Sequence, residues 1–224
     1  MELTQGAKAI RMNELIDKAN HAIQLGEWRE LQELTQILIA EDPGRWQFYQ
    51  WFGNAQFNLG KYDEAVKTYG EALELVSNES DPSADPERAK ARVTGTAKML
   101  TNQGNAYLKL KKNDHAVRAY TKAAALDPNP GTAYFNLCAT LYNQGNMDSA
   151  VSTCDKAIAA DPTRADAYFI KGSALYGSGS LDKQNKYVLP PGTIEALRKY
   201  LELSPNGGHA ADVKAMLEAV DANH

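Results

Sequence analysis

The sequence of 224 residues predicts an all-α fold in which helical hairpins stack against one another as a solenoid. Three observations lead to this prediction. Similar residues recur along the chain at a fixed spacing. Each repeat contains two stretches of apolar residues with helical periodicity, and helix-breaking residues separate those stretches. The spacing of 34 is seen between Pro128 and Pro162 and again between Gly26 and Gly60.

Three segments, which begin at Trp46, Ala97 and Gly131, align with one another without internal gaps. In the second and third segments the second helical stretch ends at Asp-Pro, because proline cannot continue a helix and disfavours helical backbone in the residue before it. The turn between the two stretches calls for a residue that tolerates positive φ after a helix end. Glycines that suit this turn are Gly60, Gly145 and Gly179.

Small side chains recur at places where the two helices of one hairpin would face each other. Contact between small residues lets antiparallel helices approach closely, and larger side chains such as Tyr69 and Tyr120 fill the wider gap to the next hairpin. A single hairpin cannot bury its apolar stripe, so stacked neighbours are required. The small residues are Gly53, Gly104 and Cys138 on the first helices and Ala65, Ala116 and Ala150 on the second helices.

The three segments carry a characteristic set of small, aromatic, leucine and proline residues. In chain order these residues are Phe52, Gly53, Ala65, Tyr69 and Ala72; Gly104, Tyr107, Ala116, Tyr120, Ala123 and Pro128; and Tyr134, Leu137, Ala150, Ala157 and Pro162. This pattern resembles the tetratricopeptide repeat (TPR) family. The resemblance implies a right-handed superhelix whose first helices line a concave face, and in this family that face binds an extended peptide or a partner helix. The closing stretch from Tyr187 to Leu217 also resembles the C-terminal ends of bacterial TPR proteins, including exported ones.

The repeat spacing divides the chain, taken as a single TPR domain over residues 1–224, into five units and a capping helix. The first unit is expected to be a degenerate cap, because Leu31 and Thr35 stand where the family has a small and an aromatic residue. A loop with the sequence "SNESDPSADPE" follows the second unit, and the helical stretch after it should lengthen the next first helix. The units span residues 12–45, 46–79, 97–130, 131–164 and 165–208, and the final helix spans residues 208–221.

The last unit contains an insertion, near 180–192, between its two helices. The small residue expected at position 184 is found instead at Ala196, twelve positions later. The insertion is predicted to form a small β-hairpin or an ordered loop, since Tyr187, Val188 and Leu189 have β character. Two roles remain open for these three residues: they cover an exposed helix surface, or they form an accessory lip that docks a partner.

Composition argues against several classes of function. The net charge of −4 and the pI near 5.6 do not suit a protein that binds nucleic acid, which would present a basic face. Apolar runs are only a few residues long, so no membrane insertion is expected. The chain would be cytoplasmic if it is complete, and periplasmic or exported if it is a fragment that lacks its signal peptide. The sequence does not predict an oligomeric state.

No catalytic constellation is found, and the protein is predicted to be neither an enzyme nor a binder of cofactors. The four histidines lie in different units without a second ligand three or four residues away, so no metal site is expected. Cys138 and Cys154 occupy interior positions of the two helices of one unit, where small thiols pack as apolar residues. A redox pair is the alternative, and it would require the two Cα atoms to lie within about 7 Å.

Projection of the first helices with a period of 3.6 gives an inner face rich in amide and aromatic side chains. Amides can donate to and accept from a peptide backbone, and aromatic rings offer contact area. The predicted function is therefore a protein–protein interaction scaffold that binds a peptide or partner protein in the concave groove. The alternative is an accessory domain that holds the substrate of a larger enzyme or of an envelope secretion or assembly complex. The candidate groove residues are Gln50, Asn54, Asn58, Lys98, Thr101, Asn102, Asn105, Lys109, Phe135, Asn136, Tyr142, Asn143, Phe169 and Tyr176.

One TPR subclass clamps the terminal carboxylate of chaperones with Lys, Asn, Asn, Lys and Arg on three consecutive first helices. Asn54 and Asn102 match the two asparagine places of that clamp. Gln50, Thr132 and Asn136 stand where its charged residues would be. The resemblance therefore does not extend to that carboxylate clamp.

Overall fold

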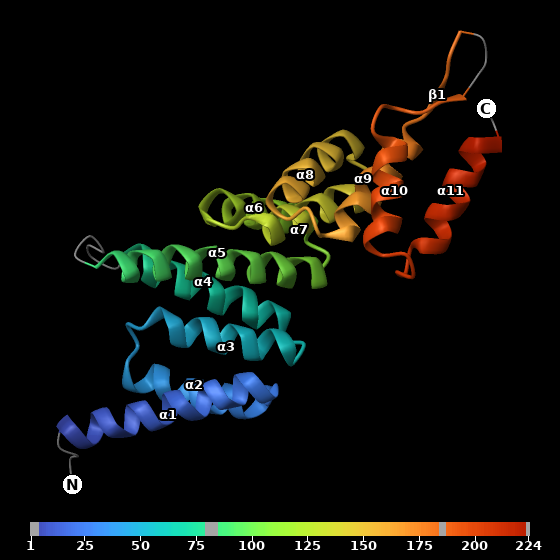
Figure 1. Ribbon diagram of the computed structural model, residues 1–224. Coiled ribbons are helices and arrows are strands. Elements are labelled where there is room, and N and C mark those ends of the chain that lie inside the picture. The colour runs from blue at the N-terminus through green and yellow to red at the C-terminus, as the bar shows by residue number, and fades with distance from the viewer. Residues whose placement is uncertain (1–4, 79–84, 184–186, 223–224) are drawn as a thin grey trace. The chain divides into compact units, whose positions relative to one another are not determined.

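The computed structural model describes residues 5–78, 85–183 and 187–222, and these residues confirm the predicted all-α class (Figure 1). Residues 79–84 of the predicted loop and residues 184–186 of the insertion lie outside the described part. The helices are α1 (Gln5–Leu25), α2 (Trp28–Glu41), α3 (Trp46–Asn58), α4 (Tyr62–Asn78), α5 (Pro86–Lys109), α6 (Asn113–Leu126), α7 (Gly131–Asn143), α8 (Met147–Ala160), α9 (Ala165–Gly177), α10 (Thr193–Leu203) and α11 (Ala210–Ala222). The strands are β1 (Ser180–Leu181) and β2 (Tyr187–Val188).

The chain forms two compact units, Met1–Ala119 and Tyr120–His224, and the boundary between them falls within α6. From here on, the first unit and the second unit mean these two parts of the chain, each of which contains several of the repeats. In the first unit each helix from α1 to α5 packs against the helix that follows or precedes it in the sequence. In the second unit the same holds from α7 to α11. None of the described helices is both long enough and apolar enough to cross a membrane.

The turns between paired helices contain the predicted glycine with positive φ, with two exceptions. Gly26, Gly60 and Gly145 have φ values of 72°, 79° and 79°, in the left-handed region that glycine adopts without a steric penalty. Lys111 stands at the corresponding place of the third hairpin and also has a positive φ, of 58°. Gly179 does not adopt this conformation; its N–H donates to the carbonyl of Tyr176, and the chain continues into β1.

Close packing within hairpins depends on the small residues that the sequence analysis identified. A Cβ atom added at Gly53 would lie 2.7 Å from the ring of Tyr69, and one added at Gly172 would lie 2.7 Å from the Leu197 side chain. The alanines on the facing helices, such as Ala65, are fully buried. These contacts are tighter than any side chain larger than glycine would allow, so they fix the spacing of the helix pairs α3–α4 and α9–α10.

The insertion forms a short antiparallel hairpin, the first of the two predicted forms. Ser180 lies opposite Val188, and Leu181 lies opposite Tyr187. Leu181 and Val188 are 62% and 47% exposed, whereas Leu189 is half-buried. The side chains of Leu181 and Val188 are therefore both exposed to solvent to a large extent.

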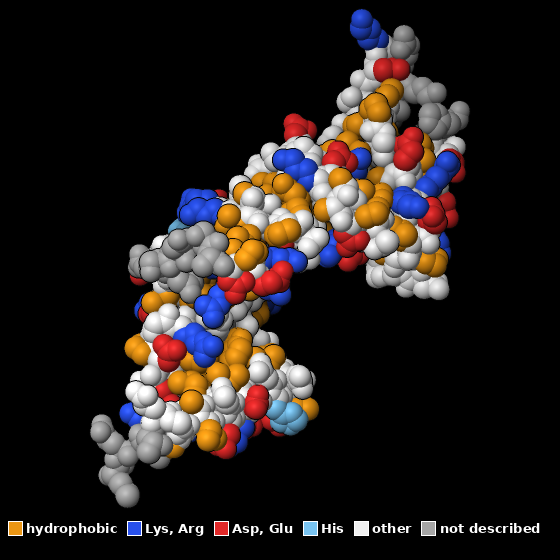
Figure 2. All heavy atoms as spheres, turned by 60° about the vertical axis from the view of Figure 1, so that its left-hand side comes forward, with side chains coloured by type: hydrophobic (Ala, Val, Ile, Leu, Met, Phe, Trp, Pro, Cys, Tyr) orange, Lys and Arg blue, Asp and Glu red, His pale blue; other side chains and the backbone are white. Residues whose placement is uncertain are grey.

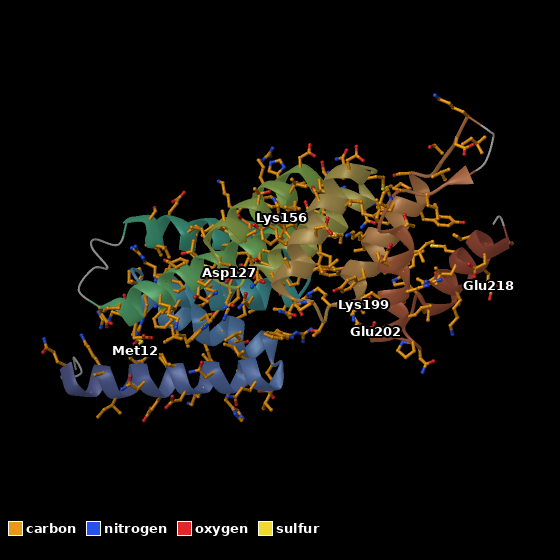
Figure 3. The ribbon with its side chains drawn as sticks, turned by 45° about the horizontal axis from the view of Figure 1, so that its top comes forward. Met12, Asp127, Lys156, Lys199, Glu202 and Glu218 are labelled. Carbon is orange, nitrogen blue, oxygen red and sulfur yellow. A yellow bond between two sulfur atoms is a disulfide. The ribbon has the colours of Figure 1, made fainter. Side chains whose placement is uncertain are left out.

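Charged side chains of both signs are interspersed on the face drawn in Figure 2. Ion pairs between them include Lys199 with Glu202, three residues apart on α10 and joined at 2.7 Å (Figure 3). The hydrogen bond that the Lys199 ammonium donates to the Glu202 carboxylate raises the pKa of Lys199 above its usual value. Exposed pairs of this kind contribute little to stability, so these residues serve mainly as a solvated surface.

Candidate functional site

The first unit contains a pocket of about 260 Å³, and several of the predicted groove residues line it. We call it the asparagine pocket. It is built from the C-terminal ends of α1 and α3, the start of α2, the middle of α4 and the C-terminal part of α5. Its lining residues are the predicted Asn54, Asn58, Asn102 and Asn105 together with Ile23, Trp28, Phe57 and Tyr69.

A hydrogen-bonded network connects three helices in this pocket. The Tyr69 hydroxyl on α4 donates to Asn54 Oδ1 on α3 at 2.8 Å. The Asn102 amide on α5 donates to the same oxygen at 3.0 Å. Asn58 donates to the backbone carbonyl of Asn54 at 2.8 Å, one helical turn away. The position of the Asn54 side chain is thus set by residues from two other helices.

Tyr69 is the buried member of the network, with 1% of its surface exposed. Burial raises the pKa of the Tyr69 hydroxyl well above its usual value, although the contact with Asn102 acts in the opposite direction. The hydroxyl therefore stays protonated throughout the physiological range and remains a donor to Asn54. Because Gly53 has no side chain, the Tyr69 ring can lie close enough to α3 to make this bond.

The remaining predicted residues of the first unit lie on the same two helices. Gln50 and Lys98 line a second pocket, of about 390 Å³. The Thr101 hydroxyl donates to the carbonyl of Ala97 on its own helix, at 3.0 Å. Lys109 is exposed in the last turn of α5. None of these side chains is buried, so all are accessible from solvent to some degree.

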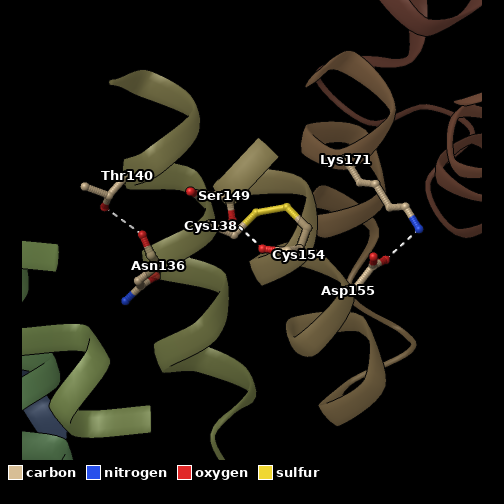
Figure 4. Close-up of a disulfide and its surroundings, with 8 residues drawn as sticks. Asn136, Cys138, Thr140, Ser149, Cys154, Asp155 and Lys171 are labelled. Atoms are coloured by element: carbon tan, nitrogen blue, oxygen red, sulfur yellow. Dashed lines mark hydrogen bonds and ion pairs between the residues drawn. A yellow bond between two sulfur atoms is a disulfide. The ribbon is translucent and has the colours of Figure 1, made fainter. Parts of the chain in front are cut away.

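In the second unit the predicted aromatic residues are largely engaged in packing. Phe135, Tyr142 and Phe169 pack against a buried cluster that contains Cys138 and Cys154. The two cysteines form a disulfide between α7 and α8, with their Cα atoms 5.2 Å apart (Figure 4). The interpretation of these cysteines as unbonded packing residues is therefore wrong. Their small, facing positions bring the sulfur atoms into bonding contact.

Residues from the C-terminal part of the chain cover Phe169. The His209 ring stacks on the Phe169 ring with centroids 3.8 Å apart and planes nearly parallel, at 4°. The Tyr200 hydroxyl accepts a hydrogen bond from the His209 backbone N–H at 3.0 Å, which holds His209 in place. Tyr176 packs against the cluster that contains Leu197 and Tyr200. Part of the predicted inner face is thus used to attach α10 and α11.

Arg164 is a residue of this surface that the sequence analysis missed. Its guanidinium lies 5.1 Å from the centroid of the Phe135 ring and donates to Asp161 at 3.2 Å and to Thr132 at 3.4 Å. Hydrogen bonds from Thr163, with the charge of Arg164, hold the pKa of Asp161 below its usual value. Arg164 precedes α9 by one residue, so a projection of the helix itself could not include it.

Ile23, Trp28 and Tyr69 were also missed, for a different reason. The projection considered only the first helices from Trp46 onward, whereas these residues belong to α1, α2 and α4. The repeat spacing relates Ile23 to Phe57, so the register itself could have found Ile23. Among the described residues, no cluster of three or more His, Cys, Asp or Glu side chains is arranged to hold a metal ion.

Stacked hairpins at a regular spacing, with small residues at their crossings, define a helical repeat protein. The chain belongs to the tetratricopeptide repeat family. Family models described as "Tetratricopeptide repeat" match residues 47–78, 101–165 and 141–184, which together make up about half of the chain. No curated protein sequence matches the chain.

Solved structures of TPR proteins share the fold at low sequence identity. One of them, "Crystal structure of YrrB: a TPR protein with an unusual peptide-binding site", has a TM-score of 0.66 and 22% identity, and the match covers 95% of this chain and 98% of that one. MamA has a TM-score of 0.65 and 18% identity over 87% and 92% of the two chains. MamA from Desulfovibrio magneticus RS-1, residues 41 to the end, has a TM-score of 0.67 and 17% identity over 88% and 97%.

Proposed function

We propose that the protein is an interaction scaffold without catalytic activity, and that it binds a peptide segment of a partner protein on the inner face of its first helices. The observation that carries this proposal is the arrangement of Asn54 and Asn102 in the asparagine pocket. The two side chains lie on adjacent first helices, α3 and α5, and they are joined by a hydrogen bond.

The unused hydrogen-bonding capacity of this pair suits a peptide backbone. Asn54 Oδ1 accepts from both Tyr69 and Asn102, so the two amide hydrogens of Asn54 remain as donors. The carbonyl oxygen of Asn102 remains as an acceptor. Within the described residues no other side chain or backbone group uses either of them. One peptide unit offers one acceptor and one donor, so it can pair with both asparagines whatever its side chains are.

Aromatic and aliphatic side chains beside the pair add contact area. Ile23, Trp28 and Phe57 line the same pocket and are half-buried, so part of each side chain is open to a ligand. Rings such as those of Trp28 and Phe57 bring large apolar area at little cost in conformational entropy. The peptide-binding site of YrrB supports a peptide as the class of ligand, although the likeness between the two chains concerns only the fold.

The second unit is proposed to contribute an additional contact surface and an accessory lip. The surface comprises Asn136 and Asn143 with the outer edges of the aromatic residues, and the lip is the hairpin with Tyr187, Val188 and Leu189. The exposure of Val188 favours the lip over the covering role. Replacing residues 181–190 by a short Gly linker should then weaken partner binding without a large fall in Tm, whereas a large fall in Tm would favour the covering role.

The proposal is tested by selecting peptides from a random 12-residue display library on the wild-type protein and measuring Kd for the enriched peptides. We expect the Asn54→Ala/Asn102→Ala variant to bind them at least tenfold more weakly, since two hydrogen bonds to the backbone are lost. A matched control is Gln36→Ala/Asn113→Ala, which removes two exposed amides outside the pocket. Equal binding by wild type and the pocket variant would contradict the proposal.

A further inference from the structure

Helix α5 begins earlier than the repeat requires, and its additional turns build a pocket of their own. The helix starts at Pro86, about three helical turns before the expected start at Ala97, and it is visibly longer than α3 in Figure 1. Asp85 caps it, because its carboxylate accepts from the backbone N–H groups of Glu87 and Arg88. The extension is therefore an ordered element with its own start signal.

The extension is anchored on the beginning of α3. A Cβ atom added at Gly95 would lie 2.3 Å from the Trp46 ring, so only glycine allows the two helices to approach this closely. Trp46 itself is 7% exposed. Beside this contact lies the pocket of about 390 Å³ that Gln50 and Lys98 also line; we call it the extension pocket.

The charged lining of the extension pocket favours an anionic group. Lys90 and Lys98 contribute two positive charges and Glu87 contributes one negative charge. Lys90, Thr94 and Lys98 are spaced four residues apart, so they follow one face of α5. Among the described residues neither lysine forms an ion pair, whereas the nearby Arg88 is paired with Asp85. Gln50 and Thr94 add neutral hydrogen-bonding groups beside the lysines.

The extension pocket lies one helical turn from the asparagine pocket on both helices. Gln50 precedes Asn54 by four residues on α3, and Lys98 precedes Asn102 by four on α5, which corresponds to about 6 Å along each helix. An extended peptide advances about 3.3 Å per residue. A peptide paired with Asn54 and Asn102 would thus bring a side chain about two residues away to Lys98.

We propose that the extension pocket selects ligands with an acidic side chain, Asp or Glu, about two residues from the peptide unit that pairs with Asn54 and Asn102. Lys98 makes the principal contact with the carboxylate and Lys90 supports it, while the edge of Trp46 packs against the aliphatic part of the ligand side chain. This inference rests on the proposed function of the asparagine pocket and specifies the class of peptide that it takes.

The test uses the same selection from a random 12-residue library on the full chain. Enriched peptides should share an Asp or Glu at one position, and replacing that residue by Asn or Gln should weaken binding to the wild type by about tenfold. Lys98→Gln should weaken binding of the acidic peptide to a similar degree. It should not change binding of the neutral peptide, in which Asn or Gln replaces the acidic residue. Lys67→Gln, an exposed lysine on α4 of the same unit, removes the same charge elsewhere and should leave Kd unchanged.

The outcomes separate this inference from the function on which it rests. If peptides bind and depend on Asn54 and Asn102 but show no acidic position, or if Lys98→Gln binds them as well as the wild type does, the inference is overturned and the proposed function stands. If no enriched peptide depends on Asn54 and Asn102, both are overturned. Circular dichroism spectra of all variants are needed to check that the helices remain intact.

Discussion

The two units share one repeat pattern, yet they use the inner faces of their first helices differently. In the first unit asparagines of α3 and α5 surround an open pocket, and the amide hydrogens of Asn54 and the side-chain carbonyl oxygen of Asn102 face no partner within the described residues. In the second unit the corresponding face of α7 and α9 is occupied by Arg164, by His209 and by packing around a disulfide. The position of a side chain within a repeat thus determines where the side chain lies. Whether it is open to a ligand depends on which other side chains pack over it.

The largest effect is expected from removing the disulfide, which occurs only in the second unit. The Cys138→Ala/Cys154→Ala variant should lose about 3 kcal/mol of unfolding free energy, because the bond closes a loop of 16 residues in the unfolded chain. All three tryptophans, Trp28, Trp46 and Trp51, lie in the first unit, so their fluorescence reports on that unit alone. Urea titration followed by circular dichroism measures the unfolding of the whole chain, and titration followed by tryptophan fluorescence measures the unfolding of the first unit.

The comparison between units would be sharpened if the two signals separate. We expect the transition seen by circular dichroism to move to lower urea more than the transition seen by fluorescence. Wild-type protein treated with a reductant should behave like the variant. A variant as stable as the oxidised wild type would show that the disulfide does not stabilise the second unit.

The next largest effect is expected at Gly53, where the first unit depends on close packing. Gly53→Ala places a methyl group 2.7 Å from the Tyr69 ring and should cost about 2 kcal/mol through overpacking. It should also weaken peptide binding, since Tyr69 positions Asn54. Tryptophan fluorescence during urea unfolding measures the loss of stability.

Gly70→Ala provides the matched control for this prediction. Gly70 lies in α4 of the same unit, and the nearest atom to an added Cβ is 3.9 Å away. Alanine should stabilise the helix there by up to about 1 kcal/mol. If both substitutions had the same effect, close packing at Gly53 would not be the reason for the glycine.

A smaller effect is expected at Lys111, which among the described residues is the one with positive φ that is not glycine. Lys111→Gly should stabilise the protein by about 1 kcal/mol, because it removes the steric cost of the left-handed conformation at a φ of 58°. Gly60→Ala and Gly145→Ala, at the corresponding turns, should destabilise by a similar amount. The melting temperatures of the three variants check this, and a lower Tm for Lys111→Gly would contradict it.

Much of this architecture could be predicted from the sequence because the repeat is a local pattern. Gly60 and Gly145 mark turns, Gly53 marks a crossing, and the helical stretch before Ala97 indicated a longer α5. The β-hairpin of the insertion was one of two predicted forms. These features depend on contacts between neighbouring segments, which the repeat spacing fixes.

The features that could not be predicted depend on side chains whose place is set by tertiary packing. Arg164 reaches Phe135 from the loop before α9, and His209 reaches Phe169 from beyond α10. Neither residue belongs to the periodic part of a helix, so periodicity carries no signal for it. A bonded cysteine pair was only the alternative to unbonded packing, because helical positions locate Cys138 and Cys154 on facing helices without giving the distance between their sulfur atoms.

The central claim is that the first unit holds the peptide through Asn54 and Asn102. The most direct measurement is a titration of the ¹⁵N-labelled protein with an enriched peptide, followed through the side-chain amide signals in two-dimensional NMR spectra. We predict that the Asn54 and Asn102 signals shift most, and that signals from the interior of the second unit stay in place. Shifts confined to the second unit, with Asn54 and Asn102 unmoved at saturation, would contradict the account.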